Sequence, residues 1–181
     1  MLSKKALGIS PSPTMAIDSK SKEMQSQGID VIGFGPGEPD FDTPTHIREA
    51  AITAINNGFT RYTPAAGTQE LKEAICEKLK DDNNLIYEPQ QIVVSNGAKH
   101  SLHNVFAALL NPGDEVLIPT PDYPLWTAAV NLSGGKAVHY ICDEQSKWYP
   151  DLDDIRSKVN EKTKGIVIIN PNNPTGANYP V

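Results

Sequence analysis

The stretch that decides the fold is GIVIINPNNPTGANYP, residues 165–180. Its first part, Gly165–Ile169, is β-branched and uncharged, which is typical of a strand buried on both faces of a parallel sheet. The strand is followed by Asn170–Gly176, where prolines flank the pair Asn172-Asn173. Ordinary turn chemistry does not need both prolines, whereas a proline-fixed asparagine amide can donate to an oxyanion. Because parallel sheets bind ligands beyond the carboxyl ends of their strands, this loop is predicted to contact a ligand.

Apolar strands and helical patterns alternate through the second half of the chain. The pattern predicts strands near 91–95, 115–118, 136–141 and 165–169, separated by helices near 98–110, 123–133 and 151–160. Strand–helix alternation with apolar strands favours an α/β domain with a largely parallel sheet flanked by helices.

The first 90 residues contain stronger helix signals than strand signals. We predict helices after Ser12-Pro13, after Thr43-Pro44 and after Thr68, each with a residue that favours a helix start. The first of these helices is expected to stop at Gly28, and the run DVIGF (30–34) is predicted to form a short strand.

Composition excludes several classes of partner. The 181 residues carry a net charge of −6, so no basic surface indicates nucleic acid or an anionic membrane. No apolar stretch approaches the ~20 residues that span a bilayer. The segment between the first lysines and Ser10-Pro11 is too short to form the apolar region of a signal peptide. Cys76 and Cys142 are interpreted as free thiols, with a single disulfide between them as the alternative, and we expect a cytoplasmic protein.

A second loop at a strand end is SNGAKHSL, residues 95–102. The amides of Gly97, Ala98 and Lys99 would open a helix, and the helix dipole favours an anion such as phosphate there. A plain Asn-Gly turn that caps a helix explains these residues equally well.

A third loop, PTPDYPLW (119–126), holds Tyr123 between prolines. A rigid aromatic side chain at this place can stack on a planar ring. Taken alone, a tyrosine packed beneath its own loop is the more common arrangement.

No metal site is predicted. His100 and His103 lie three residues apart on a helix, but no carboxylate or cysteine joins them, which favours a capping or surface role. Glu38, Asp40 and Asp42 lack the glycine turn of a calcium loop. The S-x-x-K pattern at residues 133–136 ends a helix rather than opening one, which argues against a serine nucleophile.

Four motifs together resemble one family. NPNNPTG, SNGAKHSL, GPGEPDFDTP and RYTPAAGTQELKEAI are similar to the class I pyridoxal-phosphate (PLP) aminotransferases of the type I fold, in the family's order. Residues 1–110 resemble bacterial aspartate aminotransferases, and the later part is closer to alanine aminotransferases. The resemblance implies transfer of an amino group from an L-amino acid to a 2-oxo acid such as 2-oxoglutarate.

The resemblance also implies roles for individual residues. Gly97, Ala98 and Lys99 would hold the phosphate of PLP, Tyr123 would stack on its ring, and Asn173 would donate to its phenolate oxygen. Tyr123 and Asn173 would also contact the substrate, whose carboxylate would meet the backbone N–H of Gly37. Tyr62 would reach the phosphate of the neighbouring subunit, making the full-length protein a homodimer.

The family's Schiff-base lysine, pyridinium aspartate and carboxylate-binding arginine come after NPNNPTG, so the resemblance covers only the amino-terminal portion. This chain alone is therefore expected to be inactive and to contain no catalytic residue. Residues 1–43 are expected to contribute to a small domain and lid, and 44–181 to the first part of the PLP-binding large domain. Two alternatives stay open: another PLP enzyme, such as a carbon–sulfur lyase or aminocyclopropane-carboxylate synthase, or a non-catalytic effector domain of a regulator.

Overall fold

The computed structural model describes residues 1–181 except Ser10, Pro36 and Val181. The chain divides into two compact units. Unit 1 comprises Met1–Ser10 and Asn96–Val181, and unit 2 comprises Pro11–Ser95. Each unit is described by itself.

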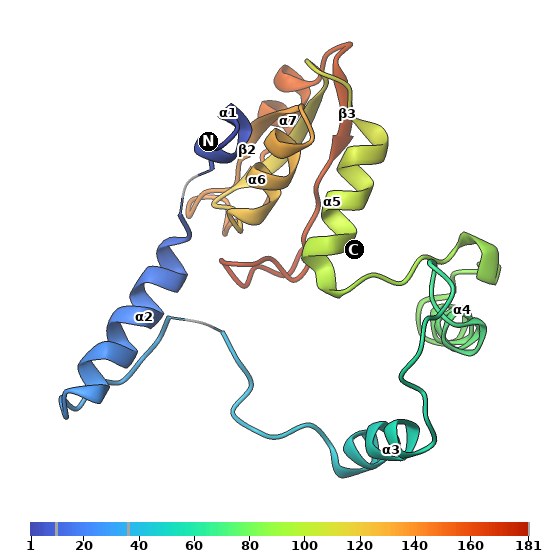
Figure 1. Ribbon diagram of the computed structural model, residues 1–181. Helices are drawn as coiled ribbons and strands as arrows, with labels where there is room; N and C mark the ends of the chain where they lie inside the picture. Colours follow the sequence, from blue (N-terminus) through green and yellow to red (C-terminus); the bar gives the residue numbers. More distant parts are fainter. Residues whose placement is uncertain (10, 36, 181) are drawn as a thin grey trace. The chain divides into compact units, whose positions relative to one another are not determined.

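Unit 1 is built on a three-stranded parallel sheet with the order β2-β1-β3. The strands are β1 (Glu115–Thr120), β2 (Lys136–Ile141) and β3 (Thr163–Ile166), and β1 lies in the middle. Figure 1 shows this sheet with helices around it. The parallel sheet flanked by helices confirms the predicted fold class, and β2 has the predicted bounds.

The two faces of the sheet are covered by different helices because side chains alternate along β1. Val116 and Ile118 pack with residues of α5 (Gly97–Leu109) and α6 (Leu125–Leu132) in one buried cluster. Leu117 points to the opposite face and packs with Tyr140 and Cys142, against which Ile155 of α7 (Leu152–Lys158) also packs. Leu117 and Ile118 are both 0% exposed, so this middle strand is the centre of the core.

The direction of α5 places its first turn at the carboxyl end of the sheet. The helix ends at Leu109 and β1 begins at Glu115 after a short link, so helix and strand run in opposite directions. The N-terminus of α5 therefore lies at the end of the sheet where β1 finishes. Figure 1 shows the segment after β3 running to this same end of unit 1.

Unit 2 contains α2 (Pro13–Ser26), α3 (Thr45–Asn56), α4 (Gln69–Asn83) and the 3₁₀ turn η1 (Pro89–Gln91). All three predicted helices are confirmed. The hydroxyls of Ser12 and Thr68 accept hydrogen bonds from first-turn amides of α2 and α4, as N-caps do. None of the residues described in unit 2 is buried.

Several expectations about secondary structure are wrong. Residues 91–95 and 30–34 form no strand in the described chain. Ile92 has extended backbone angles, but a strand also needs a ladder of hydrogen bonds. The described part of this segment makes a single long-range backbone bond, from the Val94 N–H to the Ala66 carbonyl at 3.0 Å, and no ladder. The last strand covers Thr163–Ile166 rather than 165–169, and a short helix α1 (Lys4–Leu7) was not expected. The division into domains at residue 43 stays a prediction.

No helix in the described part of the chain has both the length and the apolar character that a membrane span requires.

Candidate functional site

The first turn of α5 presents unpaired backbone amides. Gly97 opens the helix with a φ of 77°, in the left-handed region that glycine adopts at little cost. The amides of the first turn have no partner within a helix, and the N-cap residue Asn96 supplies no side-chain hydrogen bond to them. Gly97, Ala98 and Lys99 are all exposed. This turn can therefore accept an anion from solvent.

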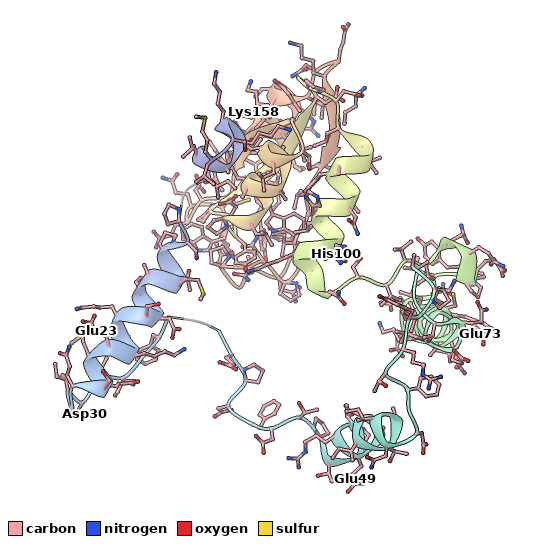
Figure 2. All side chains as sticks on the ribbon, in the orientation of Figure 1. Glu23, Asp30, Glu49, Glu73, His100 and Lys158 are labelled. Carbon is pink, nitrogen blue, oxygen red and sulfur yellow. The ribbon has the colours of Figure 1, made fainter. Side chains whose placement is uncertain are left out.

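His100 bonds the residue that precedes this turn. Its Nδ1 accepts a hydrogen bond from the backbone N–H of Asn96, at 3.2 Å. Figure 2 labels His100 at the beginning of α5. His100 thus bonds the backbone of the N-cap residue and leaves the first-turn amides without a partner. The described residues contain no group of side chains arranged to hold a metal ion.

Tyr123 lies in the link between β1 and α6. Its side chain is 38% exposed, and its carbonyl oxygen accepts the N–H of Trp126 at 3.1 Å. The link leaves β1 at Thr120, whose carbonyl accepts the N–H of Cys142 at 3.0 Å. Tyr123 is therefore attached to the carboxyl end of the middle strand with part of its ring in solvent.

Asp122, which precedes Tyr123 in the chain, takes part in a network with Thr127 and His139. The Asp122 carboxylate accepts the Thr127 hydroxyl at 2.8 Å, and the same hydroxyl oxygen is 2.9 Å from Nε2 of His139. His139 Nε2 also lies 3.7 Å from the carboxylate. Asp122 belongs to the link, Thr127 to α6 and His139 to β2, so three segments meet in this network.

The loop after β3 is organised by one asparagine and displays the next. Asn172 is buried, and its Oδ1 accepts the N–H of Thr175 at 3.1 Å and the Thr175 hydroxyl at 2.8 Å. Its backbone also pairs with Ala177 and Gly176, at 2.8 Å each. Asn173 is exposed at the tip of this closed loop. Its amide forms no hydrogen bond to another described residue.

Buried or partly buried polar groups of Tyr140, Cys142 and Tyr179 lie near the loop after β3. The Tyr140 hydroxyl donates to the carbonyl oxygen of Val167 at 2.7 Å and so fixes the end of β3. Tyr179 returns beneath the loop, near Asn172 and Cys142. Burial raises the pKa of Tyr179 and the pKa of the Cys142 thiol, so both groups stay protonated and uncharged at neutral pH.

The structure therefore brings five of the predicted site residues to one edge of unit 1, which we term the carboxyl-edge site: Gly97, Ala98, Lys99, Tyr123 and Asn173. The link after β1 and the loop after β3 lie at this edge because parallel strands share their carboxyl end. Sequence reasoning missed Asp122, Thr127, His139 and the structural role of Asn172. The tendency of asparagine to bond the backbone of its own turn could have predicted the role of Asn172. No local pattern could have predicted that His139 contacts Thr127, because the two residues belong to different elements.

Two predicted site residues belong to unit 2. Tyr62 is fully exposed in the segment between α3 and α4. A Cβ added at Gly37 would meet no atom within 4 Å, and its φ lies outside the left-handed region. The described residues thus give no steric reason for a glycine at this position.

A parallel α/β unit with an uncapped helix start, an exposed aromatic ring and an exposed amide at the carboxyl end of its strands has the arrangement in which such proteins bind ligands. Residues 29–181 match the model of the family "Aminotransferase class I and II". The chain belongs to this family.

Individual relatives support the assignment. The chain is 49% identical over 171 residues to a probable aspartate/prephenate aminotransferase of Aquifex aeolicus, covering 94% of this chain and 43% of that protein. It is 46% identical over 178 residues to an aspartate aminotransferase of Bacillus subtilis, covering 98% and 45%. The chain spans less than half the length of these relatives.

Solved structures agree. An aspartate aminotransferase from Thermus thermophilus with maleate has a TM-score of 0.96 at 40% identity, covering 99% of this chain and 47% of that one. An alanine aminotransferase from Pyrococcus furiosus has a TM-score of 0.93 at 40% identity, covering 99% and 46%. Likeness to enzymes of both names matches the mixed resemblance to aspartate and alanine aminotransferases.

Proposed function

We propose that this chain is the part of a PLP-dependent aminotransferase that forms one side of the cofactor site. The complete enzyme would move an amino group from aspartate or alanine to a 2-oxo acid such as 2-oxoglutarate. The observation that carries this proposal is the carboxyl-edge site, found in a chain that belongs to an aminotransferase family. The names of the relatives favour amino transfer over the lyase and regulator alternatives.

The residues present fit the phosphate of PLP. A dianion suits the first turn of α5, where the amides of Gly97, Ala98 and Lys99 lack partners and no side chain caps the helix. A Cβ added at Gly97 would meet no atom within 4 Å, so this turn is open to a ligand. The ammonium group of Lys99 would add a positive charge to this turn.

The residues also fit the ring of PLP. The exposed part of the Tyr123 ring offers a face for stacking, and the exposed amide of Asn173 offers a donor to a phenolate oxygen. Bound PLP would supply the electron sink that lets a proton leave the substrate's α-carbon. The residues of this chain would hold and orient the cofactor and would take no proton themselves.

Residues of unit 2 complete the proposal. Gly37 would offer its N–H to the substrate carboxylate, and Tyr62 would donate to the phosphate of the neighbouring subunit in a homodimer. Residues 1–43 would contribute to a small domain and lid, and 44–181 to the first part of the PLP-binding large domain. We further propose a cytoplasmic location. These roles rest on the family resemblance together with the exposure of Tyr62.

The test uses the full-length protein with and without added PLP. We expect it to bind PLP and to form a 2-oxo acid from aspartate or alanine when 2-oxoglutarate is supplied. A polypeptide of these 181 residues should transfer no amino group. A full-length protein that binds no PLP, or amino transfer by the 181-residue polypeptide, would contradict the proposal.

Asn173→Ala provides the residue-level test. Loss of one hydrogen bond to a charged oxygen should weaken PLP binding by roughly ten- to a hundredfold, since such bonds contribute about 1.5–3 kcal/mol. Asn178→Ala is the matched control, because Asn178 is an exposed asparagine of the same loop. Equal PLP affinities of the two variants would remove Asn173 from the site.

A further inference from the structure

We infer that Asp122, Thr127 and His139 form a positioning network that holds Tyr123 at the angle required for stacking on the cofactor. The inference rests on the proposed function, because it concerns the ring of PLP. None of the three residues is assigned to contact the cofactor or the substrate. They act on Tyr123, which follows Asp122 directly in the chain.

The hydrogen bonds of the network follow one order. The Thr127 hydroxyl donates its single proton to the Asp122 carboxylate at 2.8 Å. The second bond is made by the His139 tautomer that has its N–H at Nε2, which donates to the hydroxyl oxygen at 2.9 Å. The order is Nε2–H to hydroxyl and hydroxyl to carboxylate. Each member polarises the next, and each bond is therefore strengthened.

This order excludes a nucleophilic role. In a Ser-His-Asp triad the histidine lies between the hydroxyl and the carboxylate and can accept the hydroxyl proton. Here the hydroxyl lies between the histidine and the carboxylate, and it donates its hydrogen bond to Asp122. Thr127 therefore lacks the imidazole base of a triad, and the arrangement favours a structural role.

The network connects the link between β1 and α6 to the helix α6 and the strand β2. His139 belongs to β2, where it pairs in register with Ile118 of the middle strand, and Thr127 belongs to α6, which packs in the core. The Asp122 carboxylate is mostly enclosed, with 18% side-chain exposure. Among the described residues, the side-chain hydrogen bond of residues 121–123 is the one from Thr127 to Asp122, so removing the network leaves the bond from the Trp126 N–H to the Tyr123 carbonyl. The ring would then sample more orientations, and stacking would weaken.

The experiment compares Thr127→Val with Thr127→Ser in the full-length protein. Valine preserves shape but removes both hydrogen bonds, whereas serine retains the hydroxyl. We expect Thr127→Val to raise the dissociation constant for PLP by roughly three- to tenfold, and Thr127→Ser to stay within about twofold. PLP affinity is measured by titration of the cofactor-free protein, and the absorption spectrum of bound PLP is recorded for each variant. The spectrum of Thr127→Val should shift in the same direction as that of Tyr123→Leu.

A double-mutant cycle separates positioning from general stability. When Tyr123 is already leucine, Thr127→Val should weaken PLP binding no further, because no ring remains to be positioned. A merely structural role would lower affinity equally in both backgrounds. An equal loss in both backgrounds, or a failure of serine to rescue, would overturn the inference.

The outcomes distinguish this inference from the proposed function. If the wild-type protein binds no PLP, the proposed function fails. If the wild-type protein binds PLP and Tyr123→Leu weakens it while Thr127→Val does not, only the network fails. Should Thr127→Val not fold, His139→Leu and His139→Gln replace it: glutamine keeps an N–H donor and should retain affinity, and leucine should not.

Discussion

Unit 1 and unit 2 both contain capped helices, but among the residues that the structure describes, those of unit 1 alone include buried ones. In unit 1 the middle strand is enclosed on both faces, and Leu117 and Ile118 are 0% exposed. In unit 2 the helices α2, α3 and α4 have no buried residue, and apolar side chains such as Ile52 and Phe59 are mostly exposed.

The difference teaches what local sequence can build without a core. Caps at Ser12 and Thr68 start helices whether or not their apolar face is covered. A strand requires a ladder of hydrogen bonds to a neighbour, and the described residues of unit 2 form no such ladder. The five residues of the carboxyl-edge site all lie in the unit with the core, where loops are held by a rigid scaffold.

The largest effect is expected from truncating the core. Leu117→Ala should lower the free energy of unfolding by about 2–5 kcal/mol, because it leaves a cavity between packed side chains. Ile52→Ala, on the exposed face of α3, should change it by less than about 0.5 kcal/mol. Urea unfolding of the two variants measures both values. A large loss for Ile52→Ala would show that the apolar face of α3 is covered in the folded protein.

The two thiols offer a second contrast. Cys142 is 2% exposed and burial raises its pKa, whereas Cys76 in α4 is partly exposed. Because the thiolate is the reactive form and access is required, Cys142 should react with a thiol reagent on the order of tenfold more slowly. Mass spectrometry of a labelling time course distinguishes the sites. Comparable rates would mean that the Cys142 side of the sheet opens readily.

Acid is expected to destabilise unit 1 through two carboxylates. The amide of Asn160 and the ammonium of Lys136 lower the pKa of Glu115, and Lys158 with the Ile141 amide lowers the pKa of Asp154. The folded state thus binds fewer protons than the unfolded state. The stability from these groups is complete above their ordinary values, 4.5 for Glu115 and 3.8 for Asp154, and is lost as pH falls through the lowered values.

Urea unfolding as a function of pH measures this loss, and Asp154→Asn serves as the comparison. The variant should be less stable than wild type at neutral pH and should lose less stability on acidification. Parallel pH curves for the two proteins would contradict the assignment of acid sensitivity to Asp154.

Most helices and the parallel sheet could be predicted from the sequence because their signals are local. The cap at Thr68 and the apolar run of β1 lie within the segments that they define. The strand expected at 91–95 could not be judged locally, since pairing depends on distant residues. The same applies to the site: Tyr123 and Asn173 carry motif signals, but the contact of His139 with Thr127 arises only when β2 lies beside α6.

The smallest expected effect concerns the N-cap of α4. The Thr68 hydroxyl accepts the N–H of Leu71 at 3.4 Å, and replacement by alanine removes this bond at a cost of about 1 kcal/mol. Because no buried side chain anchors α4, the loss should appear locally. Amide hydrogen exchange in the first turn of α4 should accelerate by roughly fivefold.

Thr68→Ser is the matched control, since serine caps at least as well as threonine and should leave exchange unchanged. The amides of β1 report on unit 1 in the same experiment. If they keep their wild-type exchange rates in Thr68→Ala, the helix start in unit 2 is stabilised by its own cap alone. If they also accelerate, the stability of the sheet depends on α4, and the contrast between a unit with a core and a unit of locally stabilised helices does not hold.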